Sequence, residues 1–344
     1  LYDTYGFPLD LQEVIGEERG FAIDHEAFQR ELAEAKTRSK GSKLGEAALA
    51  DVYPKVASEV GKSEFLGYEH ETGEGNILAI LHGGERVGSL IEGEEGEIVA
   101  SRTPFYPEKG GQVGDRGVIS IGGSTFAVED TLTPIDGLVI HRGRVTKGTV
   151  KVGDAATLAV DHALRSATRR NHSATHLMHY GLRTVVGPTA MQKGSLVGPD
   201  RLRFDYSSGR ALTDDEIRRI EDIVNEAILA NEAITTETLP MDEAKARGAI
   251  GIFEEKYGDV VRMLRIGPSL ELCGGTHAYR TGDIGLFKIL SDGNVAAGVR
   301  RIEATTGLNA LAYLRSVEGT LERTATLVKT TPSKAVEQVE RVLE

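Results

Sequence analysis

The sequence predicts an α+β protein: a small β-barrel followed by an α+β domain with helices on a mainly antiparallel sheet, and helical segments at both ends. Short apolar segments separated by glycines fill residues 63–155, as in small barrels. After Asp161 the apolar residues recur with a helical period, and helical and strand-like segments then alternate to about residue 307. Helical patterns dominate residues 1–62 and 308–344.

The length and composition are those of a globular protein with several structural units. A chain of 344 residues is expected to form two or three of them. No apolar run approaches the roughly 20 residues that cross a bilayer, so no membrane association is expected. A single cysteine rules out an internal disulfide, which favours a cytoplasmic location. The net charge of −12 argues against broad, non-specific binding of nucleic acid.

Residues 1–62 are predicted to be the tail of a helical domain. Asp24 is placed to cap a helix that carries Phe28 and Leu32 on one face. The segment has too few apolar residues to form a core of its own. Because the chain opens without methionine and ends inside a helical pattern, we expect a fragment of a longer protein.

The barrel, residues 63–155, is predicted from seven short segments. Inside it, TPFYPEKGGQVGDRG contains four glycines that indicate turns or close backbone approach: Gly110, Gly111, Gly114 and Gly117. This stretch lacks the Lys-Ser/Thr pair of a phosphate-binding loop and opens no helix. The predicted strand segments are NILAILHGG, RVGSLIEG, GEIVASRTPFY, DRGVISIGG, STFAVEDTLT, LVIHRGRV and DAATLAVD.

Residues 156–307 are predicted to begin with a helix that carries two stripes. Gly187 and Pro188 end this helix, and Thr213 with Glu216 forms a capping box for a second one. The apolar stripe is Leu164, Ala167, Ala174, Met178 and Val185. The opposite stripe, expected on a common face, is Arg165, Arg169, His172, His176 and His179.

Two short motifs point to a metal site. In NHSATHLMHY, His172 and His176 are four residues apart and lie on one face of a helix. In ELCGGTH, Cys273 precedes His277 by four residues, and the two intervening glycines let the backbone fold back. Three imidazoles and a thiol are a suitable ligand set for Zn²⁺. The alternatives are a solvated histidine pair and a cysteine buried as a small apolar side chain.

The number of ligands leaves the role of the ion open. Four protein ligands would close a tetrahedral site, which is the structural arrangement, whereas a catalytic zinc keeps one position open. Either one ligand is weak, the ion expands its coordination, or it orients a substrate. His179 is a candidate proton carrier or a partner behind the ligands, and a surface histidine is the alternative.

These motifs resemble the editing domain of alanyl-tRNA synthetase. The paired HxxxH and CxxxH signature also occurs in threonyl-tRNA synthetase and in free-standing editing proteins. The sequence segments around these motifs narrow the resemblance to the alanyl family, and the resemblance covers nearly the whole chain. It consists of LYDTYGFPLDL, TPFYPEKGGQVGDRG, RRNHSATHLMH, QKGSLVGPDRLRFDY, ELCGGTH and VAAGVRRIEATTG.

The resemblance implies hydrolysis of tRNA(Ala) mischarged with serine or glycine. It implies a zinc site at His172, His176, Cys273 and His277, and a role for Gln192 in handling the amino acid. Arg300, Arg301 and Glu303 match a strand beside the pocket. The full-length parent would attach alanine to tRNA(Ala) with ATP, and this chain is expected to lack that site. Residues 1–62 match the end of a tRNA-recognition domain, and residues 308–344 match the start of a C-terminal oligomerisation region, which is a candidate homodimer contact.

The chemistry of amino-acid selection agrees with an editing role. A missing methyl or an added hydroxyl changes binding by only ~1–3 kcal/mol, so a synthetic site for alanine rejects glycine and serine weakly. No serine lies in a GxSxG elbow, and the single cysteine is assigned to metal, which favours attack by water. Basic residues that flank the motifs are expected to contact the acceptor end: Arg165, Arg169, Lys193, Arg201, Arg203, Arg300 and Arg301.

Two other interpretations stay open. One is a free-standing editing hydrolase, which the missing start and the interrupted final helix disfavour. The other is a tRNA-binding module with a purely structural zinc, which four closed ligands would favour. A deacylation assay distinguishes an editing enzyme from a binding module.

Overall fold

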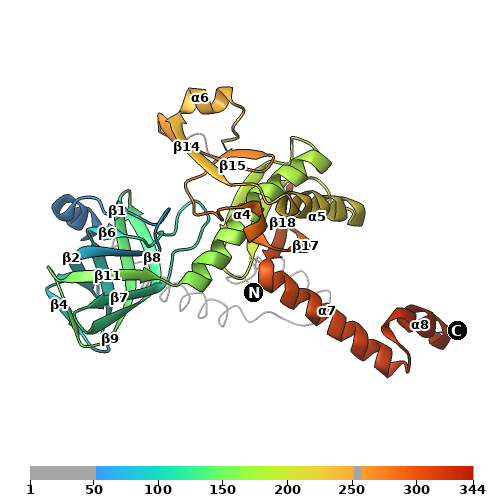
Figure 1. Cartoon of the computed structure of the whole chain (residues 1–344), viewed down its shortest axis with the longest axis horizontal. Coiled ribbons are helices and arrows are strands. Elements are labelled where there is room, and N and C mark those ends of the chain that lie inside the picture. Colours follow the sequence, from blue (N-terminus) through green and yellow to red (C-terminus); the bar gives the residue numbers. More distant parts are fainter. Residues whose placement is uncertain (1–51, 252–257, 344) are drawn as a thin grey trace, which may run out of the picture.

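The computed structural model describes residues 52–251 and 258–343. A β-barrel lies at one end, a long helix leads from it into a second domain, and a helical segment projects from that domain (Figure 1). The α+β class predicted from the sequence is therefore confirmed. The helix predicted after Asp24, and the tRNA-recognition match that includes LYDTYGFPLDL, lie outside the described residues.

Six antiparallel strands close the barrel, and each of the seven predicted segments contains a strand. The strand order is β11-β7-β8-β9-β5-β2, and pairing of β11 with β2 completes the ring. Because β11 belongs to this ring, the barrel continues past residue 155 to Val160. The ring strands are Thr72–His82 (β2), Glu95–Ala100 (β5), Gly117–Ile121 (β7), Ser124–Ile135 (β8), Leu138–Lys147 (β9) and Ala155–Val160 (β11). Shorter strands are Glu64–Phe65 (β1), Glu85–Val87 (β3), Ser89–Ile91 (β4), Arg102–Thr103 (β6) and Thr149–Lys151 (β10).

Alternating side chains of these strands fill the barrel, which explains the period of two in the sequence. Ile80, Ile98, Phe126 and Leu158 are fully buried in this core. A helix at residues 52–60 packs against the outside of the barrel, where Tyr53 and Val56 join a separate apolar cluster.

The segment 104–116 connects β6 to β7 and reaches the second domain. Its backbone forms two hydrogen bonds with Val197 of that domain. Val113 N donates to Val197 O, and Val197 N donates to Gly111 O. The glycines are required as predicted. A Cβ on Gly114 would lie 2.1 Å from the Thr131 carbonyl oxygen, and one on Gly117 would lie 2.2 Å from that of Ala159.

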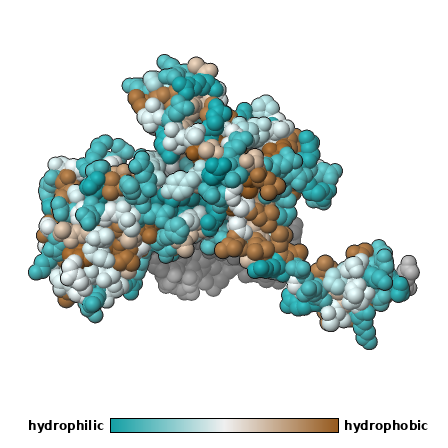
Figure 2. Space-filling view, in the orientation of Figure 1, coloured by the Kyte–Doolittle hydropathy of each residue, from teal (hydrophilic) through white to brown (hydrophobic). Residues whose placement is uncertain are grey.

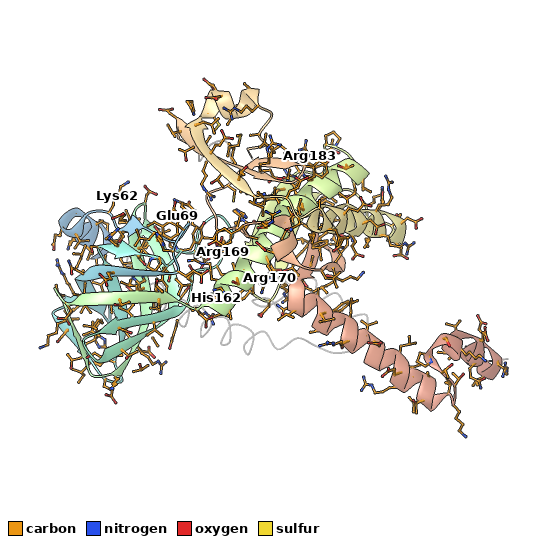
Figure 3. All side chains as sticks on the ribbon, viewed as in Figure 1. Lys62, Glu69, His162, Arg169, Arg170 and Arg183 are labelled. Carbon is orange, nitrogen blue, oxygen red and sulfur yellow. The ribbon has the colours of Figure 1, made fainter. Side chains whose placement is uncertain are left out.

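The helix α4, His162–Val186, joins the two domains and carries the histidine motif. Asp161 caps its start by accepting a hydrogen bond from Leu164 N, and Gly187 caps its end. Figure 3 shows the helix running from His162 near the barrel to Arg183 at its far end, with Arg169 toward the barrel. The predicted Arg/His stripe is a common face, but it is buried rather than open, because the barrel and the second domain both cover it.

Two helices cover one face of a four-stranded antiparallel sheet of order β12-β13-β18-β17. The second helix, α5 (Asp214–Leu229), has the capping box predicted from Thr213 and Glu216. Its Ile220 and Val224 meet Met178 of α4 and Phe204 of the sheet in the largest buried cluster of the described chain. The strands are Gln192–Val197 (β12), Leu202–Ser207 (β13), Phe287–Ala296 (β17) and Val299–Thr306 (β18).

A smaller antiparallel sheet of order β14-β15-β16 delivers the cysteine motif to α4. Leu272 ends β16, and the loop that begins at Cys273 then passes beside the histidines of α4. The elements here are Thr235–Pro240 (β14), Met241–Ala246 (α6), Val260–Ile266 (β15), Ser269–Leu272 (β16) and the 3-10 helix Thr281–Ile284 (η2).

The last segment, residues 307–343, is helical, as its sequence pattern predicts. It consists of α7, Gly307–Leu327, the 3-10 turn Pro332–Lys334 (η3), and α8, Ala335–Leu343. Apolar surface gathers where the start of α7 leaves β17 and β18 (Figure 2). In the described part of the chain, no helix combines the length and apolar character needed to cross a membrane.

Candidate metal centre

The four residues predicted to bind metal meet at one point. Ligand atoms of His172, His176, Cys273 and His277 all lie within 4.8 Å of one another, although a hundred residues separate the two motifs. The Cys273 Sγ atom lies 3.3 Å from His277 Nε2 and 3.5 Å from His172 Nε2. The rings of His172 and His176 stack with centroids 5.4 Å apart, as four-residue spacing on a helix requires.

Each imidazole contacts a second residue through its other nitrogen. The His172 Nδ1 atom lies 2.8 Å from Gln112 Oε1, and His277 Nδ1 lies 3.3 Å from Ser173 Oγ. Such outer partners commonly fix the tautomer and the ring orientation of metal-binding histidines. The arrangement therefore aims the Nε2 atoms of His172 and His277 at the Cys273 thiol.

Glu271 is the outer partner of His176. Its two carboxylate oxygens lie 2.7 Å from His176 Nδ1 and 3.0 Å from His179 Nδ1. Burial alone raises the pKa of Glu271, but the two histidines lower it to about 2. Burial lowers the pKa of His176, and Glu271 together with Cys273 raises it to about 10. A negative charge at Glu271 thus holds the His176 proton on Nδ1.

The thiol of Cys273 is set up as a thiolate. Burial raises the pKa of a thiol, but the imidazoles of His172, His277 and His176 lower the pKa of Cys273 well below its ordinary value. His277 is held in its neutral form, since burial and the nearby His172 lower its pKa to about 3. The cluster therefore provides the thiolate and a neutral imidazole, which are the ligand forms that zinc binds.

These residues fit a metal ion. The Nε2 atom of His176 is buried and has no hydrogen-bond partner in the described chain, which an ion at the cluster would supply. The donor set of one sulfur and three nitrogens suits Zn²⁺ better than a hard cation.

The CGGTH loop is held against α4 by side chains from two directions. The Tyr68 hydroxyl of the barrel donates to Gly274 O at 2.7 Å. Arg262 of β15 donates to the carbonyls of Cys273 and Gly275, at 2.9 and 3.0 Å. A Cβ on Gly275 would lie 2.1 Å from Cε1 of the His172 ring. Only glycine therefore lets the loop approach the helix this closely.

A cavity of about 870 Å³ opens beside the cluster, between the barrel and the second domain. His172, His176 and Cys273 line it, and Gln192 lies on the same wall. The Gln192 amide donates from Nε2 to Ser195 Oγ at 3.1 Å. The structure thus places Gln192 in the lining of the cavity that the metal cluster also borders.

His179 does not reach this cavity. Its side chain is 1% exposed, it shares Glu271 with His176, and its ring lies against Phe204. A proton carrier at the reacting bond must contact solvent or substrate, so the prediction of a catalytic His179 does not fit this position. The alternative, a partner behind the ligands, fits the contact with Glu271.

The arginines of α4 are the largest departure from the predicted tRNA contacts. Arg165 is 0% exposed, and its guanidinium pairs with Asp115 and donates to the Gly67 and Pro104 carbonyls. Arg169 is 5% exposed and pairs with Glu71 of the barrel. Neither guanidinium is available to a phosphate. Their positive charges instead join α4 to the barrel, because burying an arginine requires a paired acceptor.

The other predicted basic residues lie on the four-stranded sheet or, for Arg201, directly before its strand β13. Arg300 pairs with Asp292, Arg301 with Asp205, and Arg201 with Glu303. Lys193 is exposed at the cavity wall, and Arg203 is half-buried on β13. Of this group, only Lys193 combines exposure with a place in the cavity lining.

The outer partners of the site, Gln112 and Glu271, are not among the residues predicted from the sequence. Gln112 falls in the glycine-rich segment, whose sequence indicates only turn geometry, and Glu271 lies two residues before Cys273. Glu271 had a local signal, because an acidic residue beside a ligand motif is a common partner for a metal-binding histidine. Gln112 had none, since its contact with His172 spans sixty residues.

Comparisons with known proteins identify the relatives of this chain. Residues 1–164 match the family "tRNA synthetases class II (A)". Residues 261–303 match the "Threonyl and Alanyl tRNA synthetase second additional domain". The whole chain aligns with alanine–tRNA ligases of Sorangium cellulosum at 51% identity, Magnetococcus marinus at 48% and Carboxydothermus hydrogenoformans at 46%. It spans 39%, 39% and 40% of their lengths.

Both family matches are to aminoacyl-tRNA synthetases, and the second includes the loop that carries Cys273 and His277. The fold and site therefore define a part of a class II aminoacyl-tRNA synthetase. Since the alignment with alanine–tRNA ligases covers the complete chain at about half identity, the chain belongs to the alanyl-tRNA synthetase family.

Proposed function

We propose that this part of the synthetase is an editing hydrolase. Its substrate is the ester of tRNA(Ala) mischarged with serine or glycine, and its cofactor is Zn²⁺ held by His172, His176, Cys273 and His277. The observation that carries the proposal is the position of this ligand cluster in the wall of a cavity that also contains Gln192.

The chemistry of the cavity suits ester hydrolysis by water. When bound, zinc would supply positive charge to polarise a carbonyl. As a zinc ligand, the Cys273 thiolate would donate its lone pair to the ion, so it would not be free to act as a nucleophile. The Gln192 amide can donate to or accept from a serine hydroxyl, whereas the methyl group of alanine offers it no partner. This difference supports preferential handling of serine.

The cavity also has features that suit the acceptor end of a tRNA. Lys109 and Lys193 lie in its lining from opposite domains. Lys109 is paired with Asp136 at 3.2 Å between exposed side chains, a contact that a phosphate could replace at little cost. We propose Lys193, at the cavity wall, and Arg203, half-buried on β13, as phosphate contacts. Arg165 and Arg169 are buried and paired with carboxylates, so neither can take this role.

The test is deacylation of Ser-tRNA(Ala) by the 344-residue chain. We expect hydrolysis by the zinc-loaded protein and its loss in His172→Ala and in Cys273→Ala. The control is His70→Ala, which changes an exposed histidine of the barrel domain. Full activity of a zinc-free His172→Ala/Cys273→Ala protein would contradict the mechanism.

A second function, tRNA binding with a structural zinc, is favoured by one observation. Four protein ligand atoms already converge, and four ligands close a tetrahedral zinc site. A chain that binds zinc and tRNA(Ala) but leaves Ser-tRNA(Ala) intact over hours would establish this alternative. Hydrolysis by the same preparation would exclude it.

We further propose that α7 and α8 mediate association of two chains. Their apolar residues Leu308, Leu327 and Leu343 are 76%, 82% and 81% exposed. Such exposure on adjacent helices is costly in an isolated chain. Light scattering after size exclusion should give twice the chain mass, and Leu308→Glu together with Leu327→Glu should return the mass to that of one chain.

A further inference from the structure

We propose that Gln112, a residue of the barrel-domain segment 104–116, is a positioning residue of the metal centre. It fixes the tautomer and the ring orientation of His172, so residues of both domains are needed to form the centre. The inference rests on the metal-binding part of the proposed function and does not depend on ester hydrolysis.

The orientation of the Gln112 amide is determined by its partners. The backbone N–H of Thr276 donates to Oε1 at 2.9 Å, and Nε2 donates to Thr276 Oγ1 at 2.8 Å. The flipped amide would set Nε2 against the Thr276 N–H, and two donors repel each other. Oε1 therefore faces both Thr276 and His172.

This orientation determines the protonation of His172. Its Nδ1 lies 2.8 Å from an oxygen that can only accept, so Nδ1 must carry a hydrogen and donate it. In the neutral ring, Nε2 then holds the lone pair that binds a metal. That atom points to the thiol, with Sγ 3.5 Å away.

The Gln112 side chain is itself rigidly placed. It is 0% exposed, and the residues on either side of it, Gly111 and Val113, both bond to the backbone of Val197 in β12. The next residues are anchored through the buried pair of Asp115 with Arg165. A side chain held at both ends of its segment can orient a ligand without losing entropy when metal binds.

The loop with the other ligands is linked to the same side chain. Gln112 holds Thr276, the residue directly before His277, through both atoms of its amide. One barrel-domain residue thus contacts the helix ligand His172 and the loop that carries Cys273 and His277. Loss of its oxygen should weaken metal binding through two motifs at once.

The experiment measures zinc affinity of the full chain by competition with a chelator, together with melting temperatures of the metal-free and zinc-loaded forms. Gln112→Met keeps the size of the side chain but removes the acceptor. We expect it to weaken zinc binding by about 10- to 100-fold, the range typical for lost partners of metal ligands. Gln112→Glu keeps an acceptor for both Thr276 N–H and His172 Nδ1–H, and should retain affinity near that of the wild-type chain.

A matched control removes a buried hydrogen bond elsewhere. Thr305→Val eliminates the bond from Thr305 Oγ1 to Asp200 O, and should lower both melting temperatures equally while leaving zinc affinity unchanged. Equal zinc affinity in Gln112→Met and wild type would overturn the inference. Equal weakening by Met and Glu would also overturn it, because packing rather than the acceptor would then matter. Absence of zinc binding by the wild-type chain would instead overturn the metal assignment itself.

Discussion

Glu271 holds His176 by accepting a hydrogen bond from Nδ1 at 2.7 Å, in a place where the two side chains are 2% and 7% exposed. Its second oxygen accepts from His179, which is also buried. One carboxylate therefore orients two imidazoles, of which only His176 belongs to the ligand cluster.

Replacing Glu271 by glutamine should weaken metal binding. An amide has one acceptor oxygen instead of two, so one imidazole loses its partner for Nδ1 and the charge that supports it. We expect zinc affinity to fall by about 10-fold or more. Chelator competition measures this, with Glu232→Gln as the control outside the cluster. Unchanged affinity in Glu271→Gln would refute the role of the carboxylate.

The pair of Arg165 and Asp115 should contribute strongly to stability. Both side chains are buried, so Asp115→Asn leaves a guanidinium charge without its counter-ion. Breaking such a buried pair costs about 3–5 kcal/mol. Urea unfolding followed by circular dichroism measures the loss. Arg201→Gln, which breaks an exposed pair with Glu303, should cost less than about 1 kcal/mol. Similar losses in the two variants would be inconsistent with this assignment.

His141 should make the barrel sensitive to mild acid. Its ring is fully buried between Thr103 and the Ile98 carbonyl, and burial lowers its pKa from 6.5 to about 4. Above pH 6.5 neither state is protonated. As the pH falls from 6.5 toward 4, the unfolded chain takes up a proton that the folded chain does not, so stability declines.

The expected loss between pH 6.5 and 5 is about 2 kcal/mol, since one pKa unit corresponds to roughly 1.4 kcal/mol. Urea midpoints of wild type and His141→Gln at a series of pH values measure the difference in slope. The exposed His70→Gln variant is the control and should keep the wild-type slope. A wild-type slope in His141→Gln would show that another group causes the acid sensitivity.

Gln192→Ala should change discrimination without releasing metal. Its amide lines the cavity but does not contact the ligand atoms, so zinc content should stay the same. Loss of one hydrogen bond to a serine hydroxyl is worth about 1 kcal/mol, so the preference for Ser-tRNA(Ala) over Ala-tRNA(Ala) should fall roughly fivefold. Deacylation rates and metal analysis test both statements. Gln338→Ala on α8 is the control, and reduced zinc in Gln192→Ala would disprove the assigned role.

Sequence patterns predicted local structure well where a local cause decides it. The barrel strands follow from alternating apolar residues, and α5 begins at Thr213 because a capping box satisfies its first N–H groups. The prediction that the arginines of α4 contact tRNA does not hold, because a local pattern carries no information about distant elements. Helical spacing places Arg165 and Arg169 on one face, but it does not reveal that the barrel covers this face with Asp115 and Glu71.

The sequence alone was enough to predict the four residues that the structure brings together, His172, His176, Cys273 and His277. Four-residue spacing joins His172 to His176 on a helix, and two glycines let Cys273 and His277 turn toward one point. Only the tertiary structure decided how those ligands are oriented. Gln112 and Glu271 reach them through contacts spanning 60 and 95 residues, and no local pattern encodes such contacts because they arise when separate elements pack. The sequence therefore predicts which residues form the candidate metal centre, and the packing of barrel, helix and sheet determines how their side chains are oriented.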